Sequence, residues 1–153
     1  LEEVIRLIYQ SPHHHFITPR DINQNLPEAY VFESSWGMGG KHWVWDNEET
    51  TWMWDIIRIA SKEYEELDKS EPLDKLEKRV LSQALRELIL LQSSDWLFMV
   101  TNNLTRDYAM KRFFEHYAKF LRMTNALRDQ HFSLDFLNWL DKVQREDDFL
   151  IDL

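Results

Sequence analysis

The sequence contains no cysteine, only three glycines and four prolines, and no long apolar run. The lack of cysteine excludes disulfides and thiolate metal sites, and it fits the reducing cytoplasm in which we expect the protein. No stretch approaches the roughly 20 apolar residues that a bilayer-spanning helix requires. Lys and Arg number 18 against 27 Asp and Glu, a net charge of −9. Such a surface repels nucleic acids and anionic membranes, so we expect neither as a partner, whereas a neutral sugar is not disfavoured.

The length of the chain and its first residues favour one domain of a larger protein. With 153 residues, of which 44% are hydrophobic, the chain can bury one core. It opens with Leu1-Glu2-Glu3-Val4, with neither an initiator methionine nor a basic segment before an apolar one. We therefore expect residues 1–153 to form a single helical domain that belongs to a longer protein.

Helical periodicity dominates the sequence and predicts an all-α bundle of three long helices plus short ones. The long helices are expected from Thr50 or Thr51 to a break at 69–72, over about 73–93, and from Thr105 onward. Short helices are expected over 1–10, after Thr18-Pro19 as far as Pro27, and after Ser133. The run 96–101 is either an extended segment or a buried helix. The first long helix is expected to bury Trp52, Ile56, Ile59, Ala60 and Leu67.

A long loop over 27–50 departs from this helical pattern. Five of the seven tryptophans and all three glycines fall in one 19-residue window, at Trp36, Trp43, Trp45, Trp52 and Trp54 and at Gly37, Gly39 and Gly40. Loops longer than about 12–15 residues are uncommon in compact domains unless they are functional or disordered. An aromatic-rich segment seldom stays unfolded, so we expect a functional loop packed on the bundle.

Trp36, Gly37 and Trp45 are the candidate binding residues of this loop. Glycine lets the backbone turn sharply, so that a neighbouring indole can present its flat face. Such faces suit the C–H faces of pyranose rings, and the indole N–H can bond a hydroxyl. The alternative is that these tryptophans only plug the loop onto the core, in which case Trp36 and Trp45 should be completely buried.

A polar run, Gln92-Ser93-Ser94-Asp95-Trp96, interrupts an apolar helix near its expected C-terminal end. An acidic group is disfavoured there by the helix dipole, so Asp95 needs another reason for its position. It could cap the next segment, pair with Arg86, or accept hydrogen bonds from sugar hydroxyls. Glu87 is interpreted as structural, with an arginine or the backbone as its partner.

These motifs resemble family 57 glycoside hydrolases, and within them the 1,4-α-glucan branching enzymes. The matching motifs cover most of the chain from about residue 16. They are Ser34-Ser35-Trp36-Gly37 with Gly39-Gly40, Val44-Trp45-x-Asn47-x-x-Thr50-x-Trp52-x-Trp54, Gln83-Ala84-x-Arg86-Glu87-Leu88, Gln92-Ser93-Ser94-Asp95-Trp96, and Tyr108-Ala109 with Arg112-Phe113, His116 and Phe120.

The resemblance implies the C-terminal helical domain of such an enzyme, acting in glycogen biosynthesis. In that family an N-terminal (β/α)7 barrel carries a catalytic Glu and Asp for retaining transfer; neither motif is present here, so this chain alone should be inactive. The implied partners are an α-1,4-glucan and the barrel, with no cofactor. The implied substrate-binding residues are Trp36, Asp95 and Trp45, with Gly37 beside Trp36 and with Trp96 either contacting the glucan or bracing Asp95.

Departures from the family pattern leave other functions open. Met38 stands where an acidic residue is usual, and Ile56 and Arg58 stand where histidines are frequent, which affects chain-length preference and the ratio of branching to hydrolysis. An α-amylase-type hydrolase, a free-standing glucan-binding module and a ligand-free scaffold are the alternatives. We expect no metal site: the run 13–15 is interpreted as histidines with a surface or packing role, and His116 as a helix histidine with a satisfied hydrogen-bond partner.

Overall fold

The computed structural model describes residues 1–22, 28–69 and 73–149. The contacts divide the chain into two units, Leu1–Glu33 and Ser34–Leu153, and each is described by itself. Within the described ranges every regular element is a helix, which confirms the all-α prediction. None of the described helices is long and apolar enough to cross a membrane. Whether the whole chain forms one domain stays a prediction.

The first unit contains two short helical elements. The α-helix α1 runs over Glu2–Gln10 and ends at Ser11, as predicted. Thr18 begins the 3₁₀ turn η1, Pro19–Asp21, through a capping box with Asp21. This turn is shorter than the helix predicted there, whose end at Pro27 lies outside the described residues. Neither α1 nor η1 has a buried residue.

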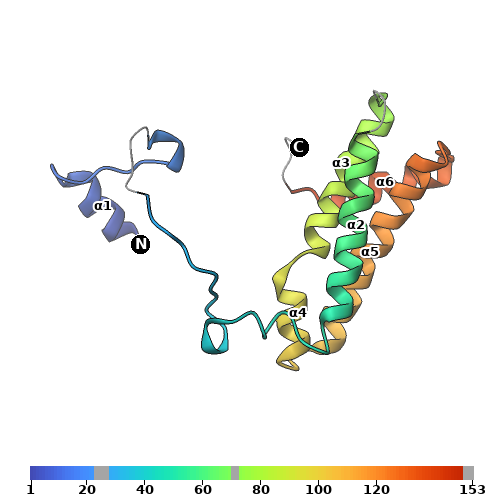
Figure 1. Cartoon of the computed structure of the whole chain (residues 1–153). Coiled ribbons are helices and arrows are strands. Elements are labelled where there is room, and N and C mark those ends of the chain that lie inside the picture. Colours follow the sequence, from blue (N-terminus) through green and yellow to red (C-terminus); the bar gives the residue numbers. More distant parts are fainter. Residues whose placement is uncertain (23–27, 70–72, 150–153) are drawn as a thin grey trace. The chain divides into compact units, whose positions relative to one another are not determined.

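The second unit is a helical bundle built on three long helices that run up, down and up in Figure 1. Its helices are α2, Thr51–Asp68; α3, Lys75–Leu91; α4, Ser94–Thr101; α5, Arg106–Arg128; and α6, Leu134–Glu146. Two of these helices, α3 and α6, begin with a side-chain cap. Asp74 accepts hydrogen bonds from the backbone N–H groups of Leu76 and Glu77, and Ser133 accepts one from Phe136. The run 96–101 is helical, so the extended alternative is wrong.

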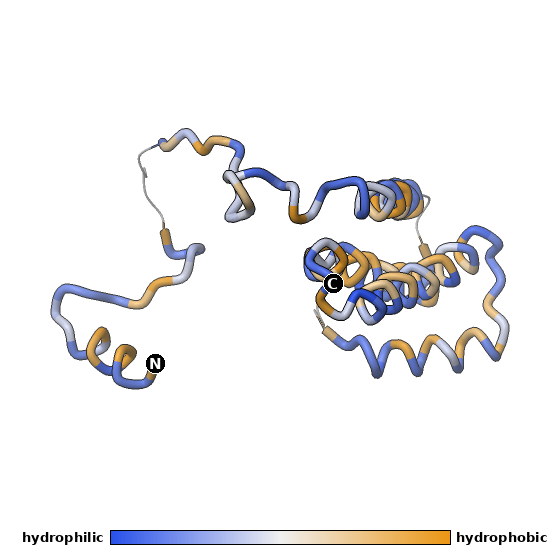
Figure 2. The backbone as a smooth tube through the Cα atoms, turned by 90° about the horizontal axis from the view of Figure 1, so that it is seen from below, coloured by the Kyte–Doolittle hydropathy of each residue, from blue (hydrophilic) through white to orange (hydrophobic). Residues whose placement is uncertain are grey.

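The core lies where α2, α3 and α5 meet. Figure 2 shows hydrophobic and hydrophilic residues alternating along the helical parts of the chain. Helical spacing predicts that α3 turns Leu76, Val80, Ala84, Leu88 and Leu91 inward; the last four are buried and Leu76 is half-buried. The face predicted for α2 is partly wrong, because Ile59 is 60% exposed while Met53 and Ile57 are buried. Since α2 packs against both α3 and α5, the face that it buries is shifted from the predicted one.

Candidate functional site

The glycine-rich segment of the loop forms a closed turn held by Ser35. The Ser35 hydroxyl donates a hydrogen bond to the carbonyl of Lys41 at 2.5 Å and accepts one from the backbone N–H of Gly37 at 3.0 Å. The Ser35 N–H in turn donates to the carbonyl of Gly40 at 2.9 Å. A short 3₁₀ turn, η2, Met38–Gly40, lies inside this loop. The turn therefore fixes the backbone on both sides of Trp36.

Gly37 has no room for a side chain. A Cβ placed there would lie 2.5 Å from the Lys41 carbonyl oxygen and 3.3 Å from the Trp45 ring. Gly39 has open space around it, but its φ of +65° is a conformation that L-residues rarely adopt. Two different constraints, a close approach and a left-handed backbone, therefore account for these two glycines.

Trp36 and Trp45 meet edge to face at the turn. Their ring centroids lie 4.9 Å apart with an interplanar angle of 89°, and Phe98 of α4 lies 5.7 Å from Trp36. Trp36 is 76% exposed, and Trp45 is half-buried. Neither ring is completely buried, contrary to the expectation for a ligand-free scaffold. A supported indole that leaves most of its surface open is suited to stacking on a ligand.

The backbone of Trp45 is anchored to the start of α2. Its carbonyl accepts hydrogen bonds from the Thr50 hydroxyl and from the indole N–H of Trp54, each at 2.9 Å. Asn47 donates to the carbonyl of Trp43 and to the Thr101 hydroxyl of α4, each at 2.8 Å. Asn47, Thr50 and Trp54 belong to a quoted motif, in which Thr50 was a possible helix start, but no anchoring of Trp45 was predicted from them. The polar residues Asn47 and Thr50 directly before α2 are the signal that could have indicated it.

A pocket of about 590 Å³ opens beside the two rings. It is lined from the loop, from α2 and from the start of α4 by Ser35, Trp36, His42, Trp45, Asp46, Trp54, Arg58 and Ser94. Three indoles thus share one pocket with one carboxylate, one guanidinium and one imidazole. This mixture of flat apolar surface and a few polar groups is typical of small-ligand sites.

Asp95 lies in the first turn of α4, directly after the pocket-lining Ser94, and does not itself line the pocket. The prediction that it sits at the C-terminal end of a helix is wrong, because α3 ends at Leu91 and a new helix begins at Ser94. A carboxylate is favourable at that position, since it faces the positive end of the helix dipole. The Asp95 side chain is exposed and makes no hydrogen bond or ion pair, with Arg86 or any other residue, in the described part of the chain.

Trp96 is held by the bundle rather than lining the pocket. Its indole N–H donates to the carbonyl of Leu90 at 2.7 Å, and its ring stacks on His116 at 6.3 Å between centroids, with an interplanar angle of 23°. Tyr108 contacts the same ring edge to face. The structure thus brings Trp36, Gly37 and Trp45 together, whereas Trp96 braces the start of α4.

A buried polar cluster joins α3, α5 and the end of α6. Glu87 Oε2 lies 2.8 Å from His116 Nδ1, and Arg112 Nη2 lies 2.9 Å from His116 Nε2. Gln83 donates to Glu87 at 3.2 Å, and Lys119 donates to Asp147 at 2.5 Å. Glu87 is structural as predicted, but its predicted partner is wrong, because His116 and Gln83 occupy its oxygens. His116 has the satisfied partners that were predicted for it.

Burial and neighbouring charges shift the pKa values of three groups in this cluster, Glu87, Lys119 and Asp147. Burial raises the pKa of Glu87, against the opposing effect of the His116 hydrogen bond. Burial acts to lower the pKa of Lys119 and to raise that of Asp147, but their mutual hydrogen bond and attraction outweigh it. The pKa of Lys119 is therefore raised and that of Asp147 lowered.

Among the described residues, Glu87, His116 and Asp147 hold the one set of ligand-type atoms close enough for a metal ion, within 4.8 Å of one another. Lys119 and Arg112 already donate to two of these three residues. The protein therefore supplies positive charge where a metal would. The histidines at 13–15 are exposed, and His14 Nδ1 lies 2.8 Å from the Ser11 hydroxyl.

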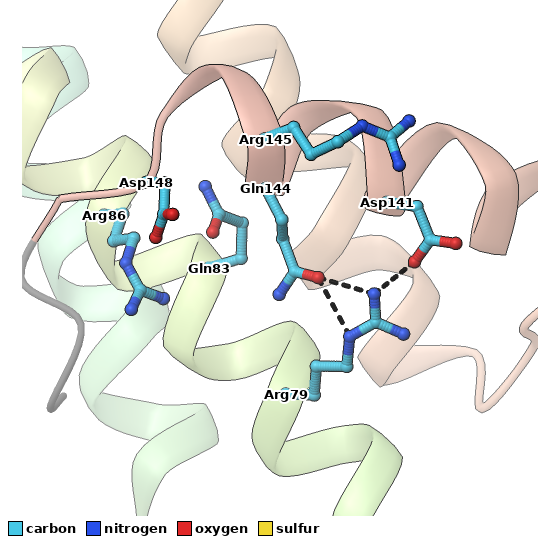
Figure 3. Close-up of a pocket in the computed structure, with 7 residues that line it drawn as sticks. All are labelled: Arg79, Gln83, Arg86, Asp141, Gln144, Arg145 and Asp148. Atoms are coloured by element: carbon cyan, nitrogen blue, oxygen red, sulfur yellow. Dashed lines mark hydrogen bonds and ion pairs between the residues drawn. The ribbon is translucent and has the colours of Figure 1, made fainter.

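A second pocket, of about 350 Å³, lies between α3 and α6 and is lined by polar side chains (Figure 3). Arg79 Nε donates to Gln144 at 2.9 Å, and Arg79 also pairs with Asp141. The remaining lining residues are Gln83, Arg86, Arg145 and Asp148. Because its arginine and carboxylate side chains join α3 to α6, we interpret this pocket as part of the helix contact.

Comparison with known proteins decides the family. Residues 56–153 match the family model described as "1,4-alpha-glucan branching enzyme, C-terminal". The chain belongs to this family. It is 33% identical over 131 residues to a 1,4-alpha-glucan branching enzyme of Thermococcus kodakarensis, covering 83% of this chain and 19% of that protein. The resemblance to the branching enzymes that the motifs indicated is thus confirmed.

Two solved structures are similar in fold to this chain. One is a GH57-type branching enzyme from Pyrococcus horikoshii, with a TM-score of 0.75 and 34% identity over 88% of this chain and 26% of that one. The other is a GH57 branching enzyme from Thermococcus kodakaraensis in complex with glucose and additives, with a TM-score of 0.69 and 30% identity over 92% and 27%. This branching-enzyme domain therefore spans about a quarter or less of the length of these relatives.

Proposed function

We propose that this chain is the helical domain of a 1,4-α-glucan branching enzyme and that its Trp36–Trp45 pair contacts the glucan. The observation that carries the proposal is the 76% exposure of Trp36, which is supported edge-on by Trp45 at the mouth of a pocket. A glucan presents the C–H faces of its rings to flat aromatic surfaces and its hydroxyls to polar groups. Asp95, exposed next to the pocket-lining Ser94, serves as a further hydroxyl acceptor.

The domain contributes binding rather than bond cleavage. Retaining glycosyl transfer uses two carboxyl groups about 5–5.5 Å apart, one as nucleophile and one as acid/base. We assign both to a catalytic barrel elsewhere in the same protein, and we expect the helical domain alone to be inactive. An aromatic wall beside the reacting bond excludes water and orients a glucan 6-hydroxyl, which favours branching over hydrolysis. We place this activity in glycogen synthesis in the cytoplasm.

The unit Leu1–Glu33 is proposed to pack on that catalytic barrel. By itself it exposes apolar side chains, among them Val4 at 54%, Leu7 at 60% and Ile17 at 64%. Val4 and Leu7 are three residues apart on α1 and therefore share one face of this helix. An amphipathic helix with an uncovered apolar face is expected to bury it against another part of the protein.

The test uses the full-length protein with amylose as substrate. Branching predicts new α-1,6 linkages, which linkage analysis of the product detects; a product with shortened α-1,4 chains alone identifies a hydrolase. Trp36→Ala is expected to weaken glucan binding roughly two- to tenfold, because an aromatic contact is worth about 0.5–1.5 kcal/mol. Trp43→Ala is the matched control, since Trp43 is 54% exposed in the same loop but does not line the pocket. Equal binding by both variants and the wild type would refute the role of Trp36.

A further inference from the structure

A sugar ring stacked on the pocket's tryptophans needs more polar partners along its edge than the indole N–H groups can supply. A pyranose ring stacked on an indole turns its C–H groups toward the aromatic face, and its hydroxyls project outward along the ring edge. Those hydroxyls leave water on binding, so each needs a donor or an acceptor in the pocket. Besides Ser35 and Ser94, the pocket-lining residues with polar ends are His42, Asp46 and Arg58.

Asp46 offers acceptor capacity beside Trp45. Its side chain is exposed, and its Oδ1 accepts one hydrogen bond, from the Thr51 hydroxyl at 3.2 Å. That hydroxyl also donates to the Asn47 carbonyl at the shorter distance of 2.7 Å, so it is shared. The backbone N–H of Asp46 donates to the His42 carbonyl at 2.9 Å, which fixes the turn that carries it. A carboxylate accepts about four hydrogen bonds, so most of its capacity remains.

Arg58 offers donor capacity from α2. It follows Trp54 by four residues, which places both on the same face of this helix, and both line the pocket. Its Nη1 donates to Asp55 Oδ1 at 2.5 Å, and this ion pair on the same helix orients the guanidinium. A guanidinium carries five N–H donors in a rigid plane, so four remain after this bond.

We propose that Asp46 and Arg58 bind neighbouring hydroxyls at the edge of a glucosyl ring that stacks on the Trp36–Trp45 pair. This inference rests on the proposed function and assigns two further binding residues to it. Asp46 accepts hydrogen bonds from the hydroxyls, and Arg58 donates to them. Asp46 supplies an acceptor and Arg58 a donor, and a ligand with vicinal hydroxyls uses both.

The experiment measures binding of a linear maltooligosaccharide to the full-length protein by calorimetry. The test variants are Asp46→Asn, which keeps the shape of the side chain and removes its charge, and Arg58→Gln, which shortens the side chain and removes its charge. The matched controls are Glu48→Gln, an exposed carboxylate in the same loop, and Lys62→Gln, one turn beyond Arg58 on α2 and paired with Glu66. Each test variant is expected to weaken binding at least threefold, and each control is expected to bind as the wild type does. Arg58→Lys should recover part of the loss, because it restores the charge and three donors.

Thermal unfolding separates a binding role from a structural one. Both side chains are exposed, so Asp46→Asn and Arg58→Gln are expected to unfold at the wild-type temperature. Wild-type binding by both variants, alongside weakened binding by Trp36→Ala, would overturn this inference and leave the proposed function standing. Wild-type binding by Trp36→Ala and Trp45→Ala as well would overturn the proposed function itself. Weakened binding together with a lowered unfolding temperature would also overturn the inference, because Asp46 or Arg58 would then support the fold.

Discussion

His116 Nδ1 lies 2.8 Å from Glu87 Oε2 across the contact between α5 and α3, and both side chains are completely buried. The other ring nitrogen of His116 faces Arg112 Nη2 at 2.9 Å. A guanidinium only donates hydrogen bonds, so Nε2 must accept, and the proton of the ring must be on Nδ1. His116 therefore donates from Nδ1 to Glu87. One imidazole thus links a buried carboxyl group to an arginine at the bundle surface.

The first prediction concerns the pH dependence of stability. Because burial raises the pKa of Glu87, the folded protein binds this proton more tightly than the unfolded chain does. The stabilisation is complete below about pH 4.5, the ordinary pKa of the group, and is lost as the pH rises through the raised value. Glu87→Gln, which has no such proton, is expected to flatten the dependence measured by urea unfolding between pH 4.5 and 8.

Asp147 does not obscure this measurement. Its pKa is lowered by Lys119, so its contribution is present above its ordinary value of 3.8 and is lost only as the pH falls below it. Glu115→Gln is the control, since Glu115 pairs with Arg112 on the side away from the buried cluster and its side chain does not contact His116. An unchanged slope in Glu87→Gln would show that Glu87 titrates alike in the folded and unfolded states.

The second prediction concerns the loss of the imidazole. His116→Ala leaves Glu87 and Arg112 without their shared partner and opens a cavity beneath Trp96. Unpaired buried polar groups and a cavity together cost roughly 2–4 kcal/mol of the free energy of unfolding. The exposed His131 provides the control, because His131→Ala removes a histidine without these contacts. Equal unfolding midpoints for the two variants would contradict a structural role of His116.

The sequence predicted those features that local patterns determine. Apolar residues at helical spacing located α3 and its buried stripe, and Ser133 located the start of α6. The Trp and Gly cluster located the loop, and its residues Trp36 and Trp45 do meet. Nine residues apart, they are joined by a turn whose glycines are visible in the sequence.

Features that depend on packing between helices could not be predicted in this way. Glu87 and His116 are 29 residues apart, and their contact depends on the register of α3 against α5. The residues that α2 buries depend on its contacts with two helices, α3 and α5. A single apolar stripe therefore predicted that Ile59 is buried, although it is exposed. For Asp95, the break between α3 and α4 spans only Gln92 and Ser93, which is too short for a periodicity argument to separate two helices.

The third prediction concerns the turn that carries Trp36. Gly37→Ala places a methyl group 2.5 Å from the Lys41 carbonyl, so the turn must open, at a cost of about 1–3 kcal/mol. Because this turn lies outside the helical core, the bundle should unfold at nearly the wild-type temperature, while glucan binding falls as far as in Trp36→Ala. Gly39→Asn is the control, since Asn tolerates the φ of +65° and has open space there. Loss of binding in the Asn variant as well would show that any change in the turn is disruptive.

The last prediction separates two tryptophans at the start of α2. Trp54→Phe removes the indole N–H that donates to the Trp45 carbonyl at 2.9 Å, whereas Trp52→Phe removes one that donates to the Glu49 carbonyl at 2.8 Å. Each variant loses one hydrogen bond, worth about 0.5–1.5 kcal/mol. Trp54 lines the pocket and Trp52 does not. Trp54→Phe should therefore weaken glucan binding by roughly two- to tenfold, because the Thr50 hydroxyl alone then holds that carbonyl.

The paired design tests whether Trp54 acts through Trp45. A positioning role predicts that Trp54→Phe has little further effect in a Trp45→Ala background, because the ring that it positions is already gone. Independent losses in the double variant would instead mean that Trp54 contacts the glucan directly. The two indoles anchor the same helix turn through different carbonyls. If Trp52→Phe weakens glucan binding as much as Trp54→Phe does, both substitutions act by loosening the start of α2, and Trp54 has no specific role in the pocket.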